Sequence, residues 1–375
     1  MLAPTITVAL DSGSSGCRAV YTGENFKPEL LFIPPEITKV TPATIAKYQE
    51  ASLGSSAASG DPFQSSWVEY SGEIYAIGYL ARYFKAISQS ERRKFEMFTP
   101  KALAVIGGIA QKHKIPNGAN VKIALLLPWA EFTDRFLFQT ILKEALADFK
   151  FCNTPKSFNL ETFVCLPEGA GVLFQGREPG TNFQDLDLAV LMLGFRDASL
   201  LSLNKGVFQG MTEGLGFSNL VKSVAEKTSL RDLQKLTEVI AKAGQKVNPS
   251  TLKPLLQNID QAYREYEQGR IRDAILEAKA QYWLTLSEWL KLQITGSEDE
   301  IIIAGGTARY LKSELNTLLT PLITGKLQWC EGLEKRIKAT FPTQIKANSL
   351  EYRLADVYSL FFYLYSRIKN QGQND

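Results

Sequence analysis

Residues 5–18 begin as an apolar strand and enter a turn of glycine and serine: Thr5-Ile6-Thr7-Val8-Ala9-Leu10-Asp11-Ser12-Gly13-Ser14-Ser15-Gly16-Cys17-Arg18. Apolar residues resume at Ala19, so the pattern predicts a second strand and a hairpin. Small residues let an anion approach the backbone, whose N–H groups can bind phosphate. Asp11 would meet a phosphate-bound Mg²⁺ through water, because Mg²⁺ sheds its hydration shell reluctantly. The same residues also fit an ordinary surface hairpin.

The composition sets limits on the class of protein. The chain has 375 residues, 45% of them hydrophobic, which is enough for two cores. Its formal net charge is only +3, so we expect no direct contact with nucleic acid. No apolar run approaches the roughly 20 residues of a membrane span, and no signal peptide is expected at the start. We therefore expect a cytoplasmic protein that does not contact a membrane.

Histidine and cysteine usage narrows the chemistry. His113 is the single histidine, which excludes multi-histidine metal sites, and its place before a proline fits a solvated helix end. The four cysteines are scattered without metal-site spacing, and we expect reduced thiols: Cys17, Cys152, Cys165 and Cys330. Any reaction here must therefore use carboxylates, hydroxyls, backbone amides and a metal.

Strands and helices alternate along the chain, which indicates a mixed α/β fold in two halves. In the first half we expect an apolar strand segment within 28–35 that prolines stop, a strand at 121–127, a hairpin at 67–78, a flexible loop at 52–61, and helices at 99–112 and 131–149. In the second half we expect strands at 163–166 and 301–304, a hairpin at 186–203, a long helix through 271–289 and a final helix through 350–365. The hairpins after Ala9 and Leu193 have a similar architecture, although no sequence repeat supports it.

Four segments in this order carry a resemblance to a known family: Asp11–Arg18, Leu166–Gly171, Leu193–Ser199 and Ile301–Ala308. Together they resemble the actin-like ATPase superfamily over essentially the whole chain. Within it, the chain is most similar to the ParM/StbA-like plasmid-segregation proteins. The resemblance implies an actin-like (ribonuclease H-like) α/β fold, with two related domains around a nucleotide cleft. Residues 1–162, with 350–375 returning to them, would form one domain, and residues 163–349 the other.

The resemblance also implies a role for each segment. Glu168 would be the catalytic residue that orients the attacking water, although a glutamate at a helix start is also common for electrostatic reasons. Asp11 would hold Mg²⁺. The two turns would bind phosphate, and the strand and glycines of Ile303–Ala308 would lie beside the adenosine. With Gly214 and Gly216, this gives these binding residues: Asp11, Ser12, Gly13, Ser14, Ser15, Arg18, Gly194, Phe195, Arg196, Asp197, Gly214, Gly216, Gly305, Gly306 and Thr307.

The second turn departs from the family pattern at one position. The family has an aspartate just before the first glycine of this loop, and Met192 stands there in Val190-Leu191-Met192-Leu193-Gly194. Asp197 is the nearest alternative carboxylate in the turn, whereas Asp187 lies roughly 15–20 Å back along the strand. Either ATP hydrolysis would be slow or the metal would be held differently, and nucleotide binding is therefore the firmer expectation.

Three functions remain open at this point. The first is a protein that binds ATP or GTP with Mg²⁺, assembles into filaments and segregates plasmid DNA through a DNA-binding adaptor protein. The second is a small-molecule kinase of the same superfamily, although no carboxylate stands out as a base for a hydroxyl acceptor. The third is a non-hydrolysing scaffold that uses nucleotide as a structural ligand, which Met192 favours. Light scattering that rises above a threshold protein concentration would separate the first from the second.

Overall fold

The structure is a computed structural model that describes residues 4–23, 27–52, 60–86, 94–174, 186–348 and 351–371. The chain divides into two compact units. The first unit comprises Met1–Arg177 and Gly332–Asp375, and the second comprises Glu178–Glu331. Most of the flexible loop expected at 52–61 lies outside the described residues. In the described part of the chain, no helix is long and apolar enough to span a membrane.

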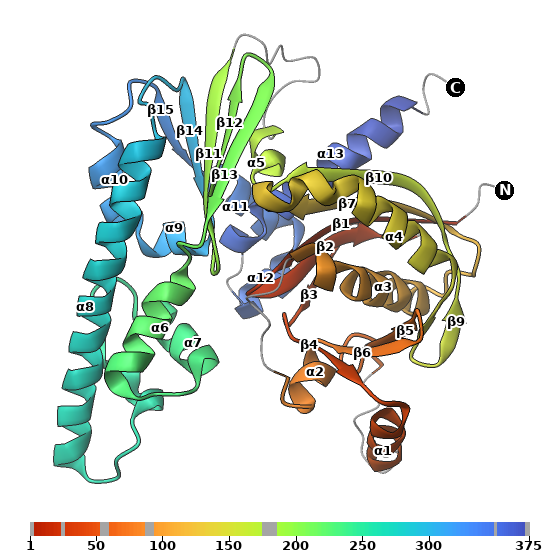
Figure 1. Ribbon diagram of the computed structural model, residues 1–375, viewed down its shortest axis with the longest axis horizontal. Helices are drawn as coiled ribbons and strands as arrows, with labels where there is room; N and C mark the ends of the chain where they lie inside the picture. Colours follow the sequence, from red (N-terminus) through yellow and green to blue (C-terminus); the bar gives the residue numbers. More distant parts are fainter. Residues whose placement is uncertain are drawn as a thin grey trace. The chain divides into compact units, whose positions relative to one another are not determined.

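The first unit is built on a five-stranded sheet of order β10-β7-β1-β2-β3 (Figure 1). Its strands are β1 (Thr5–Gly13), β2 (Gly16–Thr22), β3 (Glu29–Ile33), β7 (Asn120–Leu127) and β10 (Asn159–Pro167). β1 pairs antiparallel with β2 and parallel with β7, which in turn pairs parallel with β10. The near-continuous apolar runs of β1 and β7 fit strands that are covered on both faces.

Helices cover both faces of this sheet. The alternate residues Ile6, Val8 and Leu10 belong to one core cluster with α3 (Lys94–Lys112) and α4 (Arg135–Ala147). The other face of β1, β2 and β7 is contacted by the C-terminal helix α13 (Ala355–Gln371). Because side chains alternate between faces along a strand, Ser12 continues the Leu10 row and Asp11 lies on the α13 side.

A second sheet in the first unit has the order β4-β6-β5-β8-β9. Its strands are β4 (Ile37–Val40), β5 (Trp67–Tyr70), β6 (Glu73–Ile77), β8 (Phe149–Phe151) and β9 (Thr154–Lys156). The hairpin expected at 67–78 is confirmed, with Ser71 and Gly72 at positive φ in its turn. The remaining elements of the unit are α1 (Pro42–Ser52), α2 (Tyr79–Tyr83), η1 (Trp129–Asp134), α5 (Ala170–Phe174), α12 (Pro342–Asn348), η4 (Glu351–Arg353) and α11 (Glu331–Thr340), which starts at the unit boundary.

The second unit contains one five-stranded sheet of order β13-β12-β11-β14-β15. Its strands are β11 (Asp187–Leu193), β12 (Ala198–Asn204), β13 (Val207–Glu213), β14 (Glu300–Ala304) and β15 (Lys326–Trp329). Its helices are α6 (Phe217–Thr228), α7 (Leu233–Ala243), η3 (Pro249–Leu255), α8 (Gln261–Gln293), α9 (Gly306–Tyr310) and α10 (Lys312–Leu319). The stripe of Ile271, Ile275 and Leu286 on α8 is buried in the core of this unit, as its helical spacing predicts.

The two main sheets share one topology, which confirms the similarity expected for the two hairpins. In each, three consecutive strands form an antiparallel meander, and two later strands add in parallel beside the first of them. Two expectations need correction. Phe149 lies in a strand instead of ending a helix, and α3 begins at Lys94 instead of Thr99. The ring centroids of Phe98 on α3 and Phe138 on α4 lie 5.2 Å apart. This buried contact stabilises the part of α3 that precedes Pro100.

Candidate functional site

The β1–β2 hairpin ends in a two-residue turn. Gly13 pairs with Gly16, which leaves Ser14 and Ser15 at the tip. The register places Asp11 directly opposite Arg18, and Arg18 Nη2 lies 3.3 Å from Asp11 Oδ2. Both side chains are largely buried, with 13% and 11% of their surfaces exposed. The strand pairing itself therefore places a carboxylate and a guanidinium side by side at the base of the turn.

Two buried polar atoms beside this turn have no hydrogen-bond partner among the described residues. They are the hydroxyl oxygen of Ser12 and Nε of Arg18. The terminal nitrogens of Arg18 are used, because Nη1 donates to the carbonyl oxygen of Arg353 at 2.8 Å. A buried polar group without a partner costs about 1–3 kcal/mol, so both atoms favour a bound polar ligand or water.

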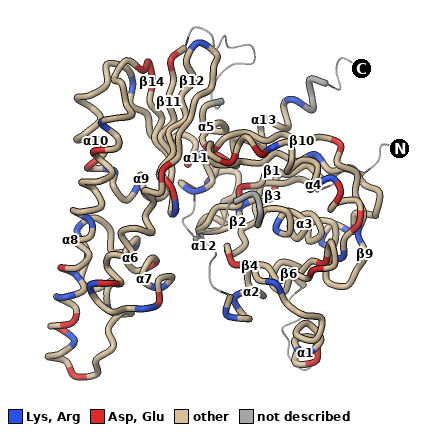
Figure 2. Tube along the Cα trace, viewed as in Figure 1, with Lys and Arg blue, Asp and Glu red and all other residues tan. Residues whose placement is uncertain are grey.

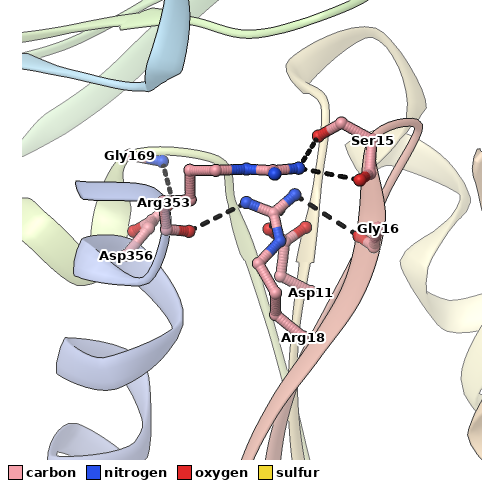
Figure 3. A network of polar contacts seen from close by, with 7 residues as sticks. All are labelled: Asp11, Ser15, Gly16, Arg18, Gly169, Arg353 and Asp356. Atoms are coloured by element: carbon pink, nitrogen blue, oxygen red, sulfur yellow. Dashed lines mark hydrogen bonds and ion pairs between the residues drawn. The ribbon is translucent and has the colours of Figure 1, made fainter. Parts of the chain in front are cut away.

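Arg353, at the end of η4, brings a second guanidinium to the turn (Figure 3). Its Nη2 donates to the carbonyl oxygen of Ser15 at 2.7 Å and to the Ser15 hydroxyl at 2.5 Å. Burial and the neighbouring Arg18 charge lower the pKa of Arg353 to about 10, so this side chain remains protonated at neutral pH. At the turn, two guanidiniums thus face the one carboxylate of Asp11, an arrangement that favours an anion.

Asp356, in the first turn of α13, holds the segment that contains Glu168. Its Oδ2 accepts from the Gly169 amide at 2.6 Å and its Oδ1 from the Val172 amide at 3.1 Å. Glu168 is half-buried and follows the last residue of β10. Burial, with further contributions from the charges of Asp11 and Glu168, raises the pKa of Asp356 to about 7. In the first unit, α13 and η4 therefore connect the two expected nucleotide segments.

The turn of the second unit is closed by its own backbone. The Gly194 amide donates to the Asp197 carbonyl at 2.9 Å. The carbonyls of Gly194, Phe195 and Arg196 accept from the first amides of α6 and the residue before it. The turn therefore satisfies N–H groups at the start of α6, and this helix start is already capped by protein. Arg196 Nε also donates to Asp197 Oδ2 at 2.6 Å.

The later glycines gather at this same turn. The Thr307 hydroxyl donates to the Gly194 carbonyl at 2.7 Å, which attaches the β14–α9 junction to the turn. A Cβ on Gly305, whose φ is +102°, would lie 2.3 Å from the Leu193 carbonyl oxygen. A Cβ on Gly216 would overlap the Phe195 and Arg196 backbone. By contrast, a Cβ on Gly214 would meet no atom within 4 Å.

Each unit therefore brings its own candidate residues together. In the first unit these are the residues of the Asp11–Arg18 turn and, through Asp356, the Glu168 segment. In the second unit they are the Gly194–Asp197 turn, Gly216, and Gly305 with Gly306 and Thr307 at the start of α9. Gly216 and Gly305 are explained by local packing, whereas Gly214 faces open space and has no such explanation.

Comparison with solved structures identifies the fold. The crystal structure of the archaeal actin homologue Ta0583 superposes with a TM-score of 0.58 at 13% identity, over 96% of this chain and 99% of that one. The apo psk41 ParM protein gives 0.53 at 14% identity, over 98% of both chains. The filament structure of AlfA from Bacillus subtilis plasmid pLS32 gives 0.51 at 14% identity, over 86% of this chain and 91% of that one. The fold is actin-like. No protein-family model and no curated protein matches the sequence.

The residues of the first-unit turn suit a phosphate group. Its buried donors, its two guanidiniums and its glycine-rich backbone suit an anion. Within the described ranges, no group of three or more His, Cys, Asp and Glu could hold a metal ion by itself. A Mg²⁺ ion would accordingly depend on Asp11, on water and on phosphate oxygens.

Met192 stands near the end of β11, at the position where the resemblance described in the sequence analysis implies an aspartate. It pairs with Ser199 on β12 and Ala304 on β14. Side chains alternate between the two faces along a strand, so Met192 lies on the face opposite to Leu191 and Leu193. Those two leucines belong to the core of the second unit. The side chain is half-buried, so a thioether occupies a partly accessible position at the edge of the turn.

Sequence reasoning missed Arg353 and Asp356, although both touch the candidate segments. The available signal was two charged residues, three apart, at the start of the apolar run Leu354–Leu364. Residues three apart share a helix face. That pattern predicts a helix start but does not reveal which segment the charges would contact.

Proposed function

We propose that the chain is a nucleotide-dependent filament protein that segregates plasmid DNA. It binds ATP or GTP with Mg²⁺, associates with further copies of itself and reaches its DNA cargo through a DNA-binding adaptor protein. The observation that carries the proposal is the first-unit turn of an actin-like fold, in which Arg18 and Arg353 face Asp11 beside buried unpartnered donors.

The residues have separate roles in this proposal. The two turns, Asp11–Arg18 and Gly194–Asp197, bind phosphate, while Gly214, Gly216 and the Gly305–Thr307 segment contact the nucleoside. Asp11 binds Mg²⁺ through water. Mg²⁺ would neutralise negative charge on the phosphates, and Glu168 would orient the attacking water. Met192 stands where a carboxylate before the second turn would help to hold the metal, so the ATPase activity would be slow.

Filament formation and an adaptor are supported by two further observations. AlfA, to which the fold is similar, is described as a filament from a plasmid, and at 14% identity that likeness establishes the fold alone. Lys and Arg are interspersed with Asp and Glu along the described parts of both units, without a continuous basic stripe (Figure 2). A mixed surface of this kind favours an adaptor protein over direct DNA binding in the cytoplasm.

Electron microscopy of the purified full chain tests the proposal. We expect filaments with Mg²⁺ and ATP or GTP, and single particles without nucleotide or with EDTA. Light scattering should rise only above a threshold protein concentration. Nucleotide binding without any filament or threshold would contradict polymerisation and favour the small-molecule kinase, whose scattering stays low at every concentration.

Met192 favours one alternative, in which the nucleotide is a structural ligand that is not hydrolysed. Phosphate release from the wild type and from Glu168→Ala separates the two readings. Slower release from Glu168→Ala supports the catalytic role of Glu168. Equal release from both proteins would contradict it and favour the scaffold.

A further inference from the structure

The start of the C-terminal helix makes two separate attachments in the first unit. Arg353 donates to both acceptors of Ser15, its carbonyl oxygen and its hydroxyl. Its guanidinium also lies 5.7 Å from the centre of the Phe32 ring on β3, a cation–π contact. Arg18 returns a hydrogen bond from the hairpin to the Arg353 carbonyl oxygen. The turn is therefore fixed to the C-terminal segment from both sides.

The second attachment lies three residues further on. Both carboxyl oxygens of Asp356 accept backbone N–H groups, those of Gly169 and Val172. The contact is close, because a Cβ on Gly171 would lie 2.3 Å from the Asp356 carbonyl oxygen. The side chain of Asp356 is buried, with 4% of its surface exposed. Figure 3 shows Arg353 extending toward Ser15 while Asp356 points toward Gly169.

We propose that Arg353 and Asp356 are positioning residues: Arg353 sets the phosphate-binding turn, and Asp356 sets the segment of Glu168. This inference rests on the proposed nucleotide function. The two residues are three apart, so one short stretch of chain supports both segments, each through its own residue. Arg353 thereby acts on nucleotide affinity, and Asp356 acts on the position of Glu168.

The hydrogen bonding of Ser15 gives this role a chemical basis. A hydroxyl that accepts from a guanidinium must direct its own hydrogen elsewhere. Arg353 therefore orients the Ser15 hydroxyl as a donor for another acceptor, such as a phosphate oxygen at the turn. One guanidinium nitrogen reaches both Ser15 acceptors while the guanidinium also lies over the Phe32 ring, and a lysine keeps the charge but lacks the planar group.

The test compares Arg353→Met, Arg353→Lys and Asp356→Asn with the control Arg367→Lys, an exposed position further along α13. ATP affinity is measured in the full chain by titration with Mg²⁺ present. We expect Arg353→Met to weaken ATP binding about 30-fold and Arg353→Lys about 5-fold, a partial rescue by charge. Asp356→Asn and Arg367→Lys should remain within about 3-fold of the wild type.

Hydrogen exchange of the nucleotide-free proteins supplies a second readout. Arg353→Lys should accelerate exchange in peptides that cover residues 12–17 but not in those that cover 168–173. Asp356→Asn should give the reverse pattern, because it removes a charged acceptor of the Gly169 and Val172 amides. This crossed pattern distinguishes positioning from a general loss of packing, which would accelerate exchange in both segments.

The outcomes separate the inference from the proposed function. Wild-type binding with unchanged affinity in both Arg353 variants overturns the inference alone, as does equal acceleration of both segments in every variant. A wild-type chain that binds neither ATP nor GTP overturns the proposed function and, with it, the nucleotide role of Arg353 and Asp356.

Discussion

The two hairpin turns occupy the same place in sheets of the same strand order, yet they are stabilised differently. The first turn, at Asp11–Arg18, is stabilised mainly by side chains. Asp11 and Arg18 form an ion pair across the strands, and the guanidinium of Arg353 donates to Ser15. In the second, at Gly194–Asp197, the backbone dominates, and three carbonyls of the turn satisfy amides at the start of α6.

The difference shows that a repeated backbone does not repeat its chemistry. The first turn retains unpartnered donors at Ser12 and Arg18, the property of a site that binds something else. The second has its carbonyls committed and Met192 in place of a carboxylate. We infer that the first turn supplies most of the phosphate affinity and that the second contributes mainly shape.

The largest expected effect is a pH dependence of stability that arises from Asp356, the buried acid that holds the Glu168 segment of the first unit. The pKa of Asp356 is raised from its ordinary 3.8 to about 7, so this group stabilises the fold fully below about pH 4 and loses that contribution as the pH rises through 7. At about 1.4 kcal/mol for each pKa unit, the decrease amounts to about 4 kcal/mol. Asp11 and Glu168 are the charged groups that contribute to this raised pKa.

Urea denaturation between pH 4 and 7.5 measures this effect as the difference between the wild type and Asp356→Asn. The variant should have a lower free energy of unfolding at acid pH. Both carboxyl oxygens of Asp356 accept a backbone N–H, and the NH₂ group of asparagine is a donor that would face one of these N–H groups. As the pH rises toward 7, the unfolding free energy of the wild type should fall relative to that of the variant, so the difference between the two proteins should change steadily in favour of the variant. Parallel pH curves for the two proteins would show that Asp356 does not titrate in this range.

The next effect tests the rigidity of the second turn. Gly305→Ala requires a positive φ and places Cβ 2.3 Å from the Leu193 carbonyl oxygen, so we expect a loss of about 3 kcal/mol in unfolding free energy. Gly214→Ala, which meets no atom within 4 Å, is the matched control and should stay within about 0.5 kcal/mol. A Cβ on Gly13 would lie 2.3 Å from Nη2 of the Arg18 side chain and 3.4 Å from the nearest backbone atom, so Gly13→Ala should cost an amount between these two. Similar losses at Gly305 and Gly214 would contradict a rigid second turn.

The hairpins, the main strands and the mixed α/β class were predictable from the sequence because apolar runs and turn residues are local signals. β13 was not, because its residues alternate between half-exposed and exposed, and Gly210 interrupts any strand pattern. Arg353 and Asp356 were not, because their partners Ser15 and Gly169 lie far away along the chain. Strands and turns can be predicted from local sequence patterns, whereas the residues that hold a site in place are identified only by their tertiary contacts.

A third prediction compares the carboxylates of the two turns. Asp11→Asn should weaken binding of ATP about 30-fold with Mg²⁺, because the water-mediated metal contact is lost. With EDTA the same variant should bind ATP at least as well as the wild type, since without Mg²⁺ the Asp11 carboxylate only adds negative charge near the phosphates. Asp197→Asn, whose carboxylate pairs with Arg196, should change affinity less than about 3-fold. Equal losses in both variants, measured by titration, would remove the distinction between the turns.

The smallest expected effect comes from placing an aspartate before the second turn, as in the pattern that the resemblance implies. Met192→Asp adds a carboxylate at a half-buried position beside Ser199, and we expect phosphate release to rise about 10-fold with Mg²⁺ and ATP. Partial burial of the charge should cost about 1–2 kcal/mol in unfolding free energy. Met192→Asn, similar in size but uncharged, controls for the loss of the thioether and should leave the rate unchanged. If the Asn and Asp variants release phosphate at the same rate, the missing carboxylate is not what limits hydrolysis, and the two turns differ in shape rather than in metal chemistry.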